Sequence, residues 1–123
     1  EAVVDTLKTS TQMGLKTKKF EKQVANIFNK KYGIAVNSGS SANLLALSSF
    51  NFKKGSEIIT TSLTFSTTVA PIYQLGLIPH FIGVLENKFV ADTSQIEDCI
   101  NKKTVAIMIP NLLGNIVNWK KIK

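Results

Sequence analysis

The spacing of apolar residues divides the chain into alternating helices and strands. Between Lys18 and Tyr32 apolar side chains recur every three or four residues, which predicts a helix with one buried face. Gly33 then supplies a C-terminal stop. Short runs of apolar and β-branched residues further along predict strands. The predicted strands are 34–37, 57–61, 77–84 and 104–109. The predicted helices between them are 41–50, a segment from the 62–68 loop to about residue 75, and a segment after Ser94.

Capping residues set the expected ends of these helices. Ser40 is a good N-cap for the helix over 41–50, because its hydroxyl can accept a free backbone N–H. Ser94 followed by Glu97 forms a capping-box pattern. Pro71 is tolerated in its helix only in or near the first turn, because proline lacks a backbone N–H.

The order of the elements predicts the fold class. Strands separated by helices imply right-handed crossovers and a mainly parallel sheet. The unbroken apolar run over 104–109 suits a sheet that is covered on both faces. We therefore expect a three-layer α/β domain over 18–123, preceded by an N-terminal segment, 1–17, of weak periodicity. The pattern does not fix the order of the strands.

Polar loops follow three of the predicted strands, at 37–41, 62–67 and 110–115. In parallel α/β sheets ligands bind at the carboxyl ends of the strands, so these loops are expected to converge on one site. The loops are therefore where we look for chemistry.

The first loop suits a phosphate group. Gly39, Ser40 and Ser41 lie between an apolar strand and an apolar helix. Free backbone N–H groups, the helix dipole and two hydroxyls would all favour an anion there. An ordinary strand-to-helix turn with a serine cap remains an open alternative. The glycine spacing matches neither a P-loop nor a dinucleotide-binding fingerprint.

The other two loops offer an aromatic ring and amides. Phe65 lies among hydroxyl residues at a strand end, where it could stack on a planar ligand or instead pack the next helix into the core. Asn111 and Asn115 flank Gly114 and could bind a polar ligand or simply form turns.

The charge does not indicate a nucleic-acid partner. The formal net charge is +7, and all 15 basic residues are lysines. They lie mostly in pairs at element ends and in loops, without a helix-turn-helix, zinc-finger or aromatic RNA-binding signature. The sequence contains no arginine, the residue that most often makes bidentate hydrogen bonds to guanine and to phosphate. We expect a solvated basic surface and no nucleic-acid ligand.

Few residues can do acid–base or metal chemistry. Cys99 is the single cysteine and lies in an apolar stripe, which predicts a small core residue. His80, the single histidine, is expected to be a packed or edge-strand residue, and no zinc site can be built from one of each. Glu57 is read as a solvated charge at a strand end. No apolar run has the length of a membrane span and no signal peptide is evident, so we expect a cytoplasmic protein without a membrane partner.

Several motifs together resemble the pyridoxal-phosphate sugar aminotransferase family (DegT/DnrJ/EryC1/StrS). Each is weak alone, but they follow in the family's order over nearly the whole chain after residue 14. They are Phe20-Glu21, Asn37–Leu45, Gly55–Ile59, Thr64–Thr68, Gly76–Pro79, Thr104–Ile107 and Leu112–Asn115. The sequences SGSSANLL and NLLGN resemble the branch of nucleotide-sugar 3-dehydratases.

The resemblance implies the fold and the cofactor site. The fold would be part of the large domain of the aspartate-aminotransferase-like fold, PLP fold type I, in a homodimer. Gly39, Ser40 and Ser41 match the turn for the phosphate of pyridoxal or pyridoxamine 5′-phosphate, and Phe65 matches the aromatic residue on its pyridine ring. Ser66 and Asn111 are further cofactor-binding candidates, and Asn115 is a weaker candidate for the substrate.

The resemblance also implies that the chemistry needs residues not found here. The family's Asp on the pyridine nitrogen, and its catalytic Lys (His in the dehydratase branch), match no position in 1–123. We expect a partial domain that stops before the catalytic residue and is inactive alone. Its parent would act on nucleotide-linked 4-keto-6-deoxy sugars, as an aminotransferase or a 3-dehydratase. The alternative is a non-catalytic α/β module that binds phosphates or nucleotides.

Overall fold

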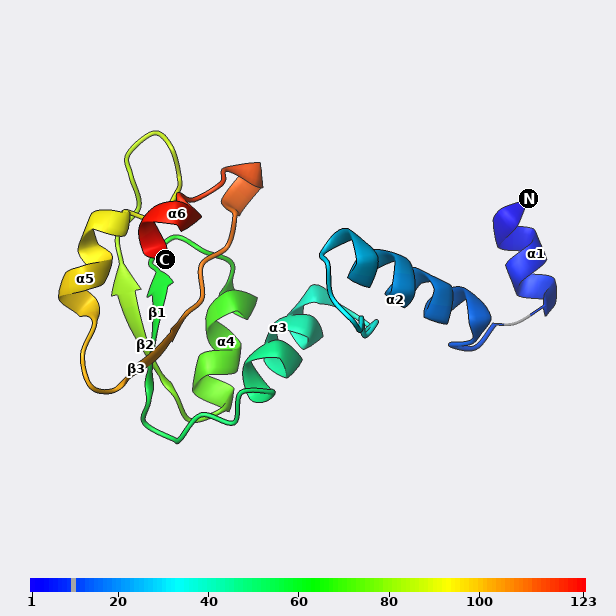
Figure 1. Cartoon of the computed structure of the whole chain (residues 1–123), viewed down its shortest axis with the longest axis horizontal. Coiled ribbons are helices and arrows are strands. Elements are labelled where there is room, and N and C mark those ends of the chain that lie inside the picture. The colour runs from blue at the N-terminus through cyan, green and yellow to red at the C-terminus, as the bar shows by residue number, and fades with distance from the viewer. Residues whose placement is uncertain (10) are drawn as a thin grey trace. The chain divides into compact units, whose positions relative to one another are not determined.

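The computed structural model describes residues 1–9 and 11–123, in two compact units. The first unit comprises 1–37 and the second comprises 38–123. The sheet and the loops that follow its strands belong to the second unit, shown in turquoise to red in Figure 1. Within the described ranges, no helix is long and apolar enough to cross a membrane.

The first unit holds two helices, α1 (Ala2–Thr9) and α2 (Leu15–Ile27). The sequence pattern did not predict α1, and it placed the end of α2 five residues too late. The left-handed residue that follows the C-cap of α2 is Asn29, with a φ of 51°, and not Gly33 as predicted. The N–H of Lys30 donates to the carbonyl of Ala25 at 2.8 Å, which closes the helix in the manner of a Schellman motif.

Gly33 has a different role, that of a close contact. A Cβ atom at this position would lie 2.6 Å from the carbonyl oxygen of Glu21, so the chain passes α2 where only glycine fits. The predicted strand over 34–37 is wrong: these residues pair with no strand in the described part of the chain. The backbone N–H of Ala35 donates instead to the Glu21 carboxylate at 2.8 Å.

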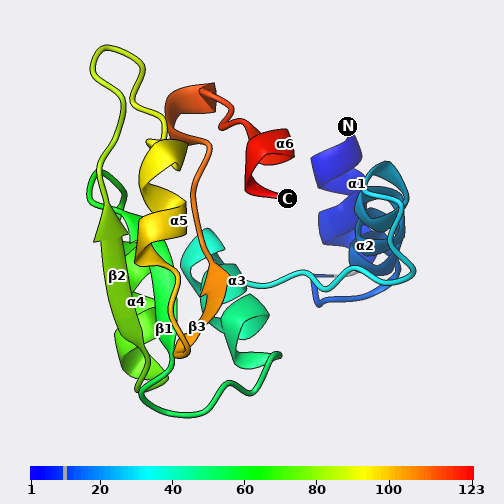
Figure 2. The same cartoon turned by 60° about the vertical axis from the view of Figure 1, so that its left-hand side comes forward.

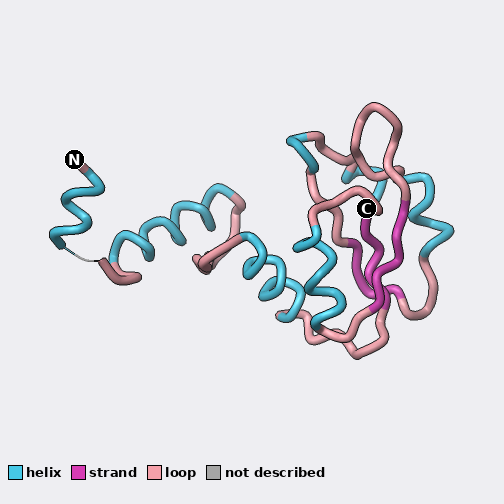
Figure 3. The backbone as a smooth tube through the Cα atoms, turned by 180° about the vertical axis from the view of Figure 1, so that it is seen from behind, coloured by secondary structure: helices cyan, strands magenta, loops and turns pink. Residues whose placement is uncertain are grey.

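The second unit contains a parallel sheet of three strands. They are β1 (Glu57–Thr61), β2 (Ile78–Ile82) and β3 (Thr104–Ile107), in the order β2-β1-β3. β1 is central and pairs in parallel with both neighbours, and the three strands lie side by side in Figure 3. The bounds predicted for β1 are confirmed, while β2 and β3 are shorter than their apolar runs.

Helices cover both faces of this sheet (Figures 1 and 2). α3 (Gly39–Ser48) and α4 (Ser66–Gln74) lie on the face to which Ile58 points, in a cluster with Leu47, Ile72 and Leu77. The short helices α5 (Ile96–Cys99) and α6 (Trp119–Ile122) lie on the other face. There Ile59 packs with buried Ile82, Ala91, Ile96 and Val117, and half-buried Cys99 packs against this cluster. The three-layer prediction and the core role of Cys99 are confirmed.

Two details of the helices differ from the sequence-based expectation. The cap before α5 is Asp92, not a box of Ser94 and Glu97: its carboxylate accepts from the backbone N–H of Ser94 at 3.1 Å and from the Ser94 hydroxyl at 2.6 Å. These bonds start a single 3₁₀ turn, Thr93–Gln95, ahead of α5. Pro71 lies in the second turn of α4, past the position where its missing N–H is harmless.

Candidate functional site

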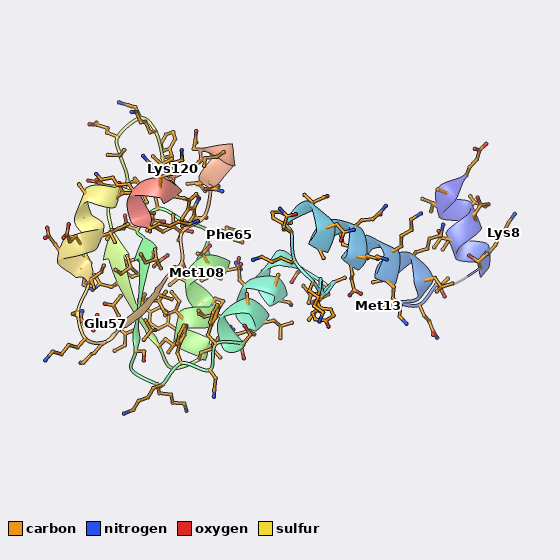
Figure 4. The ribbon with its side chains drawn as sticks, in the orientation of Figure 1. Lys8, Met13, Glu57, Phe65, Met108 and Lys120 are labelled. Atoms are coloured by element: carbon orange, nitrogen blue, oxygen red, sulfur yellow. The ribbon has the colours of Figure 1, made fainter. Side chains whose placement is uncertain are left out.

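The candidate site lies at the carboxyl edge of the sheet. β1 runs into the loop that precedes α4, and β3 runs into the loop that contains a 3₁₀ turn, Leu112–Gly114. Figure 4 shows Phe65 at this edge, where α4 begins, and Glu57 at the opposite edge, where β1 begins. The parallel arrangement therefore places the loops after these two strands at one end of the sheet, as predicted. The loop 37–41, which was predicted to follow a third strand, follows none in the described residues.

The first turn of α3 presents free backbone N–H groups. Its N-cap is Ser38 rather than Ser40, and the Ser38 hydroxyl accepts from the N–H of Ser41 at 3.2 Å. The carbonyl of Ser38 takes the N–H of Ala42 at 3.0 Å. No acceptor among the described residues takes the N–H groups of Gly39 and Ser40. These two donors lie at the positive end of the helix dipole, where an anion is favoured.

There is room for a ligand before this turn. A Cβ atom added at Gly39 would meet nothing within 4 Å, and the side chain of Ser40 is exposed. Ser40 and Ser41 also line a groove of about 210 Å³ between α3 and α4, together with Thr67 and Pro71. The two helix starts thus share one hollow surface.

Phe65 is available to a ligand. It is the N-cap residue of α4, and 70% of its surface is exposed. The alternative that Phe65 packs α4 into the core is therefore wrong. Ser66, the first residue of α4, is also exposed.

The third loop forms a turn and contributes less. The amide of Asn115 donates to the carbonyl of Leu112 at 3.1 Å, so its side chain serves the turn. The backbone N–H of Gly114 donates to the carbonyl of Asn111 at 3.1 Å, and Gly114 has a φ of 82°. The side chain of Asn111 is exposed. Within the described residues, no hydrogen bond joins this loop to α3 or α4.

One residue of the site is missed by pattern reasoning. The side-chain amide of Asn43, in α3, donates to the backbone carbonyl of Thr67, in α4, at 3.2 Å. Pro71 was the sequence signal that could have indicated this bond, because a proline in the second turn of a helix leaves the carbonyl four residues earlier without its N–H donor. A sequence shows that this donor is lost, but it does not show which side chain replaces it.

The titratable cluster of the second unit lies at the other edge of the sheet. The carboxylate of Glu57 accepts from the amide of Asn101 at 2.7 Å and lies 3.5 Å from Nδ1 of His80. Its side chain is only 17% exposed, so the prediction of a solvated strand-end charge is wrong. The Asn101 hydrogen bond, helped by His80, lowers the pKa of the Glu57 carboxyl below its usual 4.5.

This shift predicts how stability depends on pH. A carboxyl whose pKa is lower in the folded state stabilises the fold above its unfolded pKa, and this contribution is lost as the pH falls below 4.5 through the folded value. Urea unfolding followed between about pH 5 and pH 3 should therefore show a shallower loss of stability for Glu57→Gln than for the wild type. Glu86→Gln, at an exposed position, is the control. Equal slopes for Glu57→Gln and the wild type would contradict the prediction.

Among the described residues, no three His, Cys, Asp or Glu side chains are grouped so that they could hold a metal ion. What the geometry offers is a helix start with two free N–H donors, hydroxyls beside it, and an exposed aromatic ring on the next helix start. These features belong to an α/β chain, and they are the types of group that the sequence predicted for a phosphorylated planar ligand.

The chain belongs to the DegT/DnrJ/EryC1/StrS aminotransferase family, whose profile matches residues 1–123. It is 38% identical over 109 residues to a GDP-4-keto-6-deoxy-D-mannose 3-dehydratase from Yersinia pseudotuberculosis. The Escherichia coli GDP-4-keto-6-deoxy-D-mannose-3-dehydratase with hydrated PLP bound is 36% identical and superposes with a TM-score of 0.91 over 98% of this chain. A Streptococcus pneumoniae protein described as a sugar aminotransferase, in its PLP form, is 26% identical, covers 98% of this chain and superposes with a TM-score of 0.88.

These similarities confirm the predicted family and fold class: the chain has part of PLP fold type I. The match covers 84% of this chain but 28% of the length of the Yersinia relative. It covers 33% and 31% of the Escherichia coli and Streptococcus pneumoniae structures. The relatives therefore contain long further segments that this chain does not match.

Proposed function

We propose that this chain is the N-terminal part of a PLP- or PMP-dependent enzyme that acts on nucleotide-linked 4-keto-6-deoxy sugars. The observation that carries the proposal is the pairing of two helix starts at the sheet edge. One offers the free N–H groups of Gly39 and Ser40, and the other offers the exposed ring of Phe65. A phosphate and a planar ring joined by a short linker would use both.

The residues present fit this cofactor. The N–H groups of Gly39 and Ser40, with the hydroxyls of Ser40 and Ser41, hold its phosphate, and the face of Phe65 packs on its ring. Ser66 and Asn111 border the cofactor, and Asn115 has a lesser role toward the sugar. The bound cofactor supplies an electron sink for bond cleavage next to the keto-sugar carbon. This chain contributes binding and orientation, and the proton-transferring residue lies in another part of the protein.

Within the family we favour the 3-dehydratase reaction over the transfer of an amine. Identity is 38% and 36% to the two dehydratases, compared with 26% to the Streptococcus pneumoniae protein. Incubating the full-length protein with a GDP-linked 4-keto-6-deoxyhexose, PLP and glutamate separates the two by mass spectrometry. A dehydratase product lacks the 3-oxygen, whereas an aminotransferase product keeps it and carries a 4-amino group.

The proposal extends to assembly and location. A homodimer is supported by the family resemblance and by large apolar side chains exposed in the second unit, such as Leu45 and Tyr73. Sedimentation of the full-length protein would measure its oligomeric state. The cytoplasm, where nucleotide sugars are made and used as soluble substrates, is the proposed location.

Phe65→Ala tests the cofactor site. Losing the ring face should weaken the binding of pyridoxamine 5′-phosphate to the full-length protein about tenfold, since aromatic stacking contributes on the order of 1–1.5 kcal/mol. Isothermal titration calorimetry measures this change, and inorganic phosphate, which has no ring, should bind the variant as it binds the wild type. Phe50→Ala is the matched control, because Phe50 is 66% exposed but follows the opposite end of α3.

The controls also separate the two candidate functions. If Phe65→Ala leaves the affinity for pyridoxamine 5′-phosphate unchanged, the stacking role is wrong. If the wild type binds inorganic phosphate and nucleotides but not this cofactor, the non-catalytic binding module is the better description.

A further inference from the structure

The carbonyl of Thr67 lacks its usual helical donor. In an α-helix this carbonyl would accept from the N–H of the residue four positions later. That residue is Pro71, which lies inside α4 and has no N–H. The Pro71 side chain is fully buried, and Thr67 is half-buried.

Asn43 supplies the missing donor from a different helix. Its side-chain amide, half-buried in α3, donates to the Thr67 carbonyl at 3.2 Å. A polar group that is withdrawn from water costs free energy unless it is paired, so the proline in α4 and the asparagine in α3 compensate one another. This bond joins two helices and stands in the place of the donor that Pro71 lacks.

The bond ties together the two turns of the candidate site. Asn43 follows the phosphate turn of Ser40 and Ser41 by less than one helical turn. Thr67 directly follows Ser66 and lies two residues after Phe65. Ser40, Ser41, Thr67 and Pro71 line the same groove, beside which the bond lies.

We propose that Asn43 is a positioning residue, which fixes the distance between the phosphate turn and the ring-binding turn. This inference rests on the proposed function. The phosphate and the ring of the cofactor are a fixed distance apart, so the two turns that bind them must be held at the matching distance. A small displacement of one turn weakens binding. Inorganic phosphate uses only the first turn and is insensitive to that distance.

The test compares two ligands in full-length protein. Asn43→Ala should raise the Kd for pyridoxamine 5′-phosphate about tenfold, the order expected from one lost hydrogen bond to a half-buried carbonyl, and leave the Kd for inorganic phosphate within about twofold. Gln23→Ala is the control, because Gln23 is an exposed amide within helix α2 and outside this groove, and it should leave both Kd values unchanged. Circular dichroism of each variant confirms that it is folded.

Pro71→Ala provides a rescue. Alanine restores a backbone N–H that can donate to Thr67 within α4, so Asn43 becomes dispensable. The double variant Asn43→Ala/Pro71→Ala should bind pyridoxamine 5′-phosphate within about threefold of Pro71→Ala alone. In a double-mutant cycle, Asn43→Ala should lower the urea midpoint less in the Pro71→Ala background than in the wild type.

Two results would overturn the inference. One is a loss of inorganic phosphate binding as large as the loss of cofactor binding, which would make Asn43 a support of the phosphate turn alone. The other is no coupling between Asn43 and Pro71 in the urea cycle. If the proposed function is wrong, the wild type does not bind the cofactor. If the inference about Asn43 is wrong, the urea cycle shows no coupling. Because the cycle uses no cofactor, the two failures can be told apart.

Discussion

Ser40→Asp is expected to lower the affinity of the full-length protein for pyridoxamine 5′-phosphate by about a hundredfold or more. The new carboxylate lies at the helix start that would hold the phosphate. Two like charges about 4 Å apart repel by roughly 4 kcal/mol at an effective dielectric constant near 20. The same substitution places a negative charge at the positive end of the α3 dipole, which stabilises a helix by about 0.3–1 kcal/mol. Binding should therefore fall while thermal stability is kept or rises.

These opposite signs make the experiment decisive. Calorimetric titration gives the Kd, and a thermal melt without ligand gives the stability. Ser48→Asp, at an exposed serine near the other end of α3, is the control and should bind the cofactor normally. If Ser40→Asp binds the cofactor as well as the wild type does, the phosphate is not held at this turn.

Ile59→Ala is expected to destabilise the protein by about 2–5 kcal/mol, the range for truncating a fully buried aliphatic side chain. Ile59 has no exposed surface and lies on β1, between β2 and β3. Its side chain packs on the face covered by α5 and α6, in the cluster with Ile82 and Val117. Alanine would leave a cavity that these short elements cannot close.

The comparison residue is Ile78, which lies on the edge strand β2 and is 46% exposed. Ile78→Ala removes the same atoms but should cost less than about 1 kcal/mol, since little apolar surface is lost from the interior. Urea unfolding of both variants measures the difference. Equal losses would mean that β1 is not the centre of the core.

Local sequence signals were sufficient for much of the second unit. The β-branched run over Glu57–Thr61 gave a strand with the observed bounds, and Gly76, with a φ of 70°, ends α4 as expected. The alternation of strands and helices gave the parallel, three-layer class. These features depend on interactions between residues that are close in sequence, so the sequence pattern is enough to predict them.

Two of the errors lie where residues distant in sequence decide the local structure. The segment 34–37 has a strand-like composition, but strands exist through their partners, and here Ala35 bonds to a side chain of α2. Gly33 was read as a helix stop because glycine often is one, yet its contact with the Glu21 carbonyl requires it. The cap before α5 is an error of another kind, because the partners are close in sequence. Asp92 and Ser94 were both possible caps, and the structure shows the Asp92 carboxylate bonded to Ser94 and Gln95.

The sequence by itself determined the family and the fold class, and it supplied the candidate residues for binding a phosphate and a ring. Those rest on motifs and on short-range periodicity. Only the tertiary structure decided the strand order, the exposure of Phe65, the capping of α3 by Ser38 and the bond from Asn43 to Thr67. The physical reason is that each of these features depends on distances between groups in space. The packing of α3, α4 and the sheet fixes those distances, and they cannot be read from the spacing of residues along the chain.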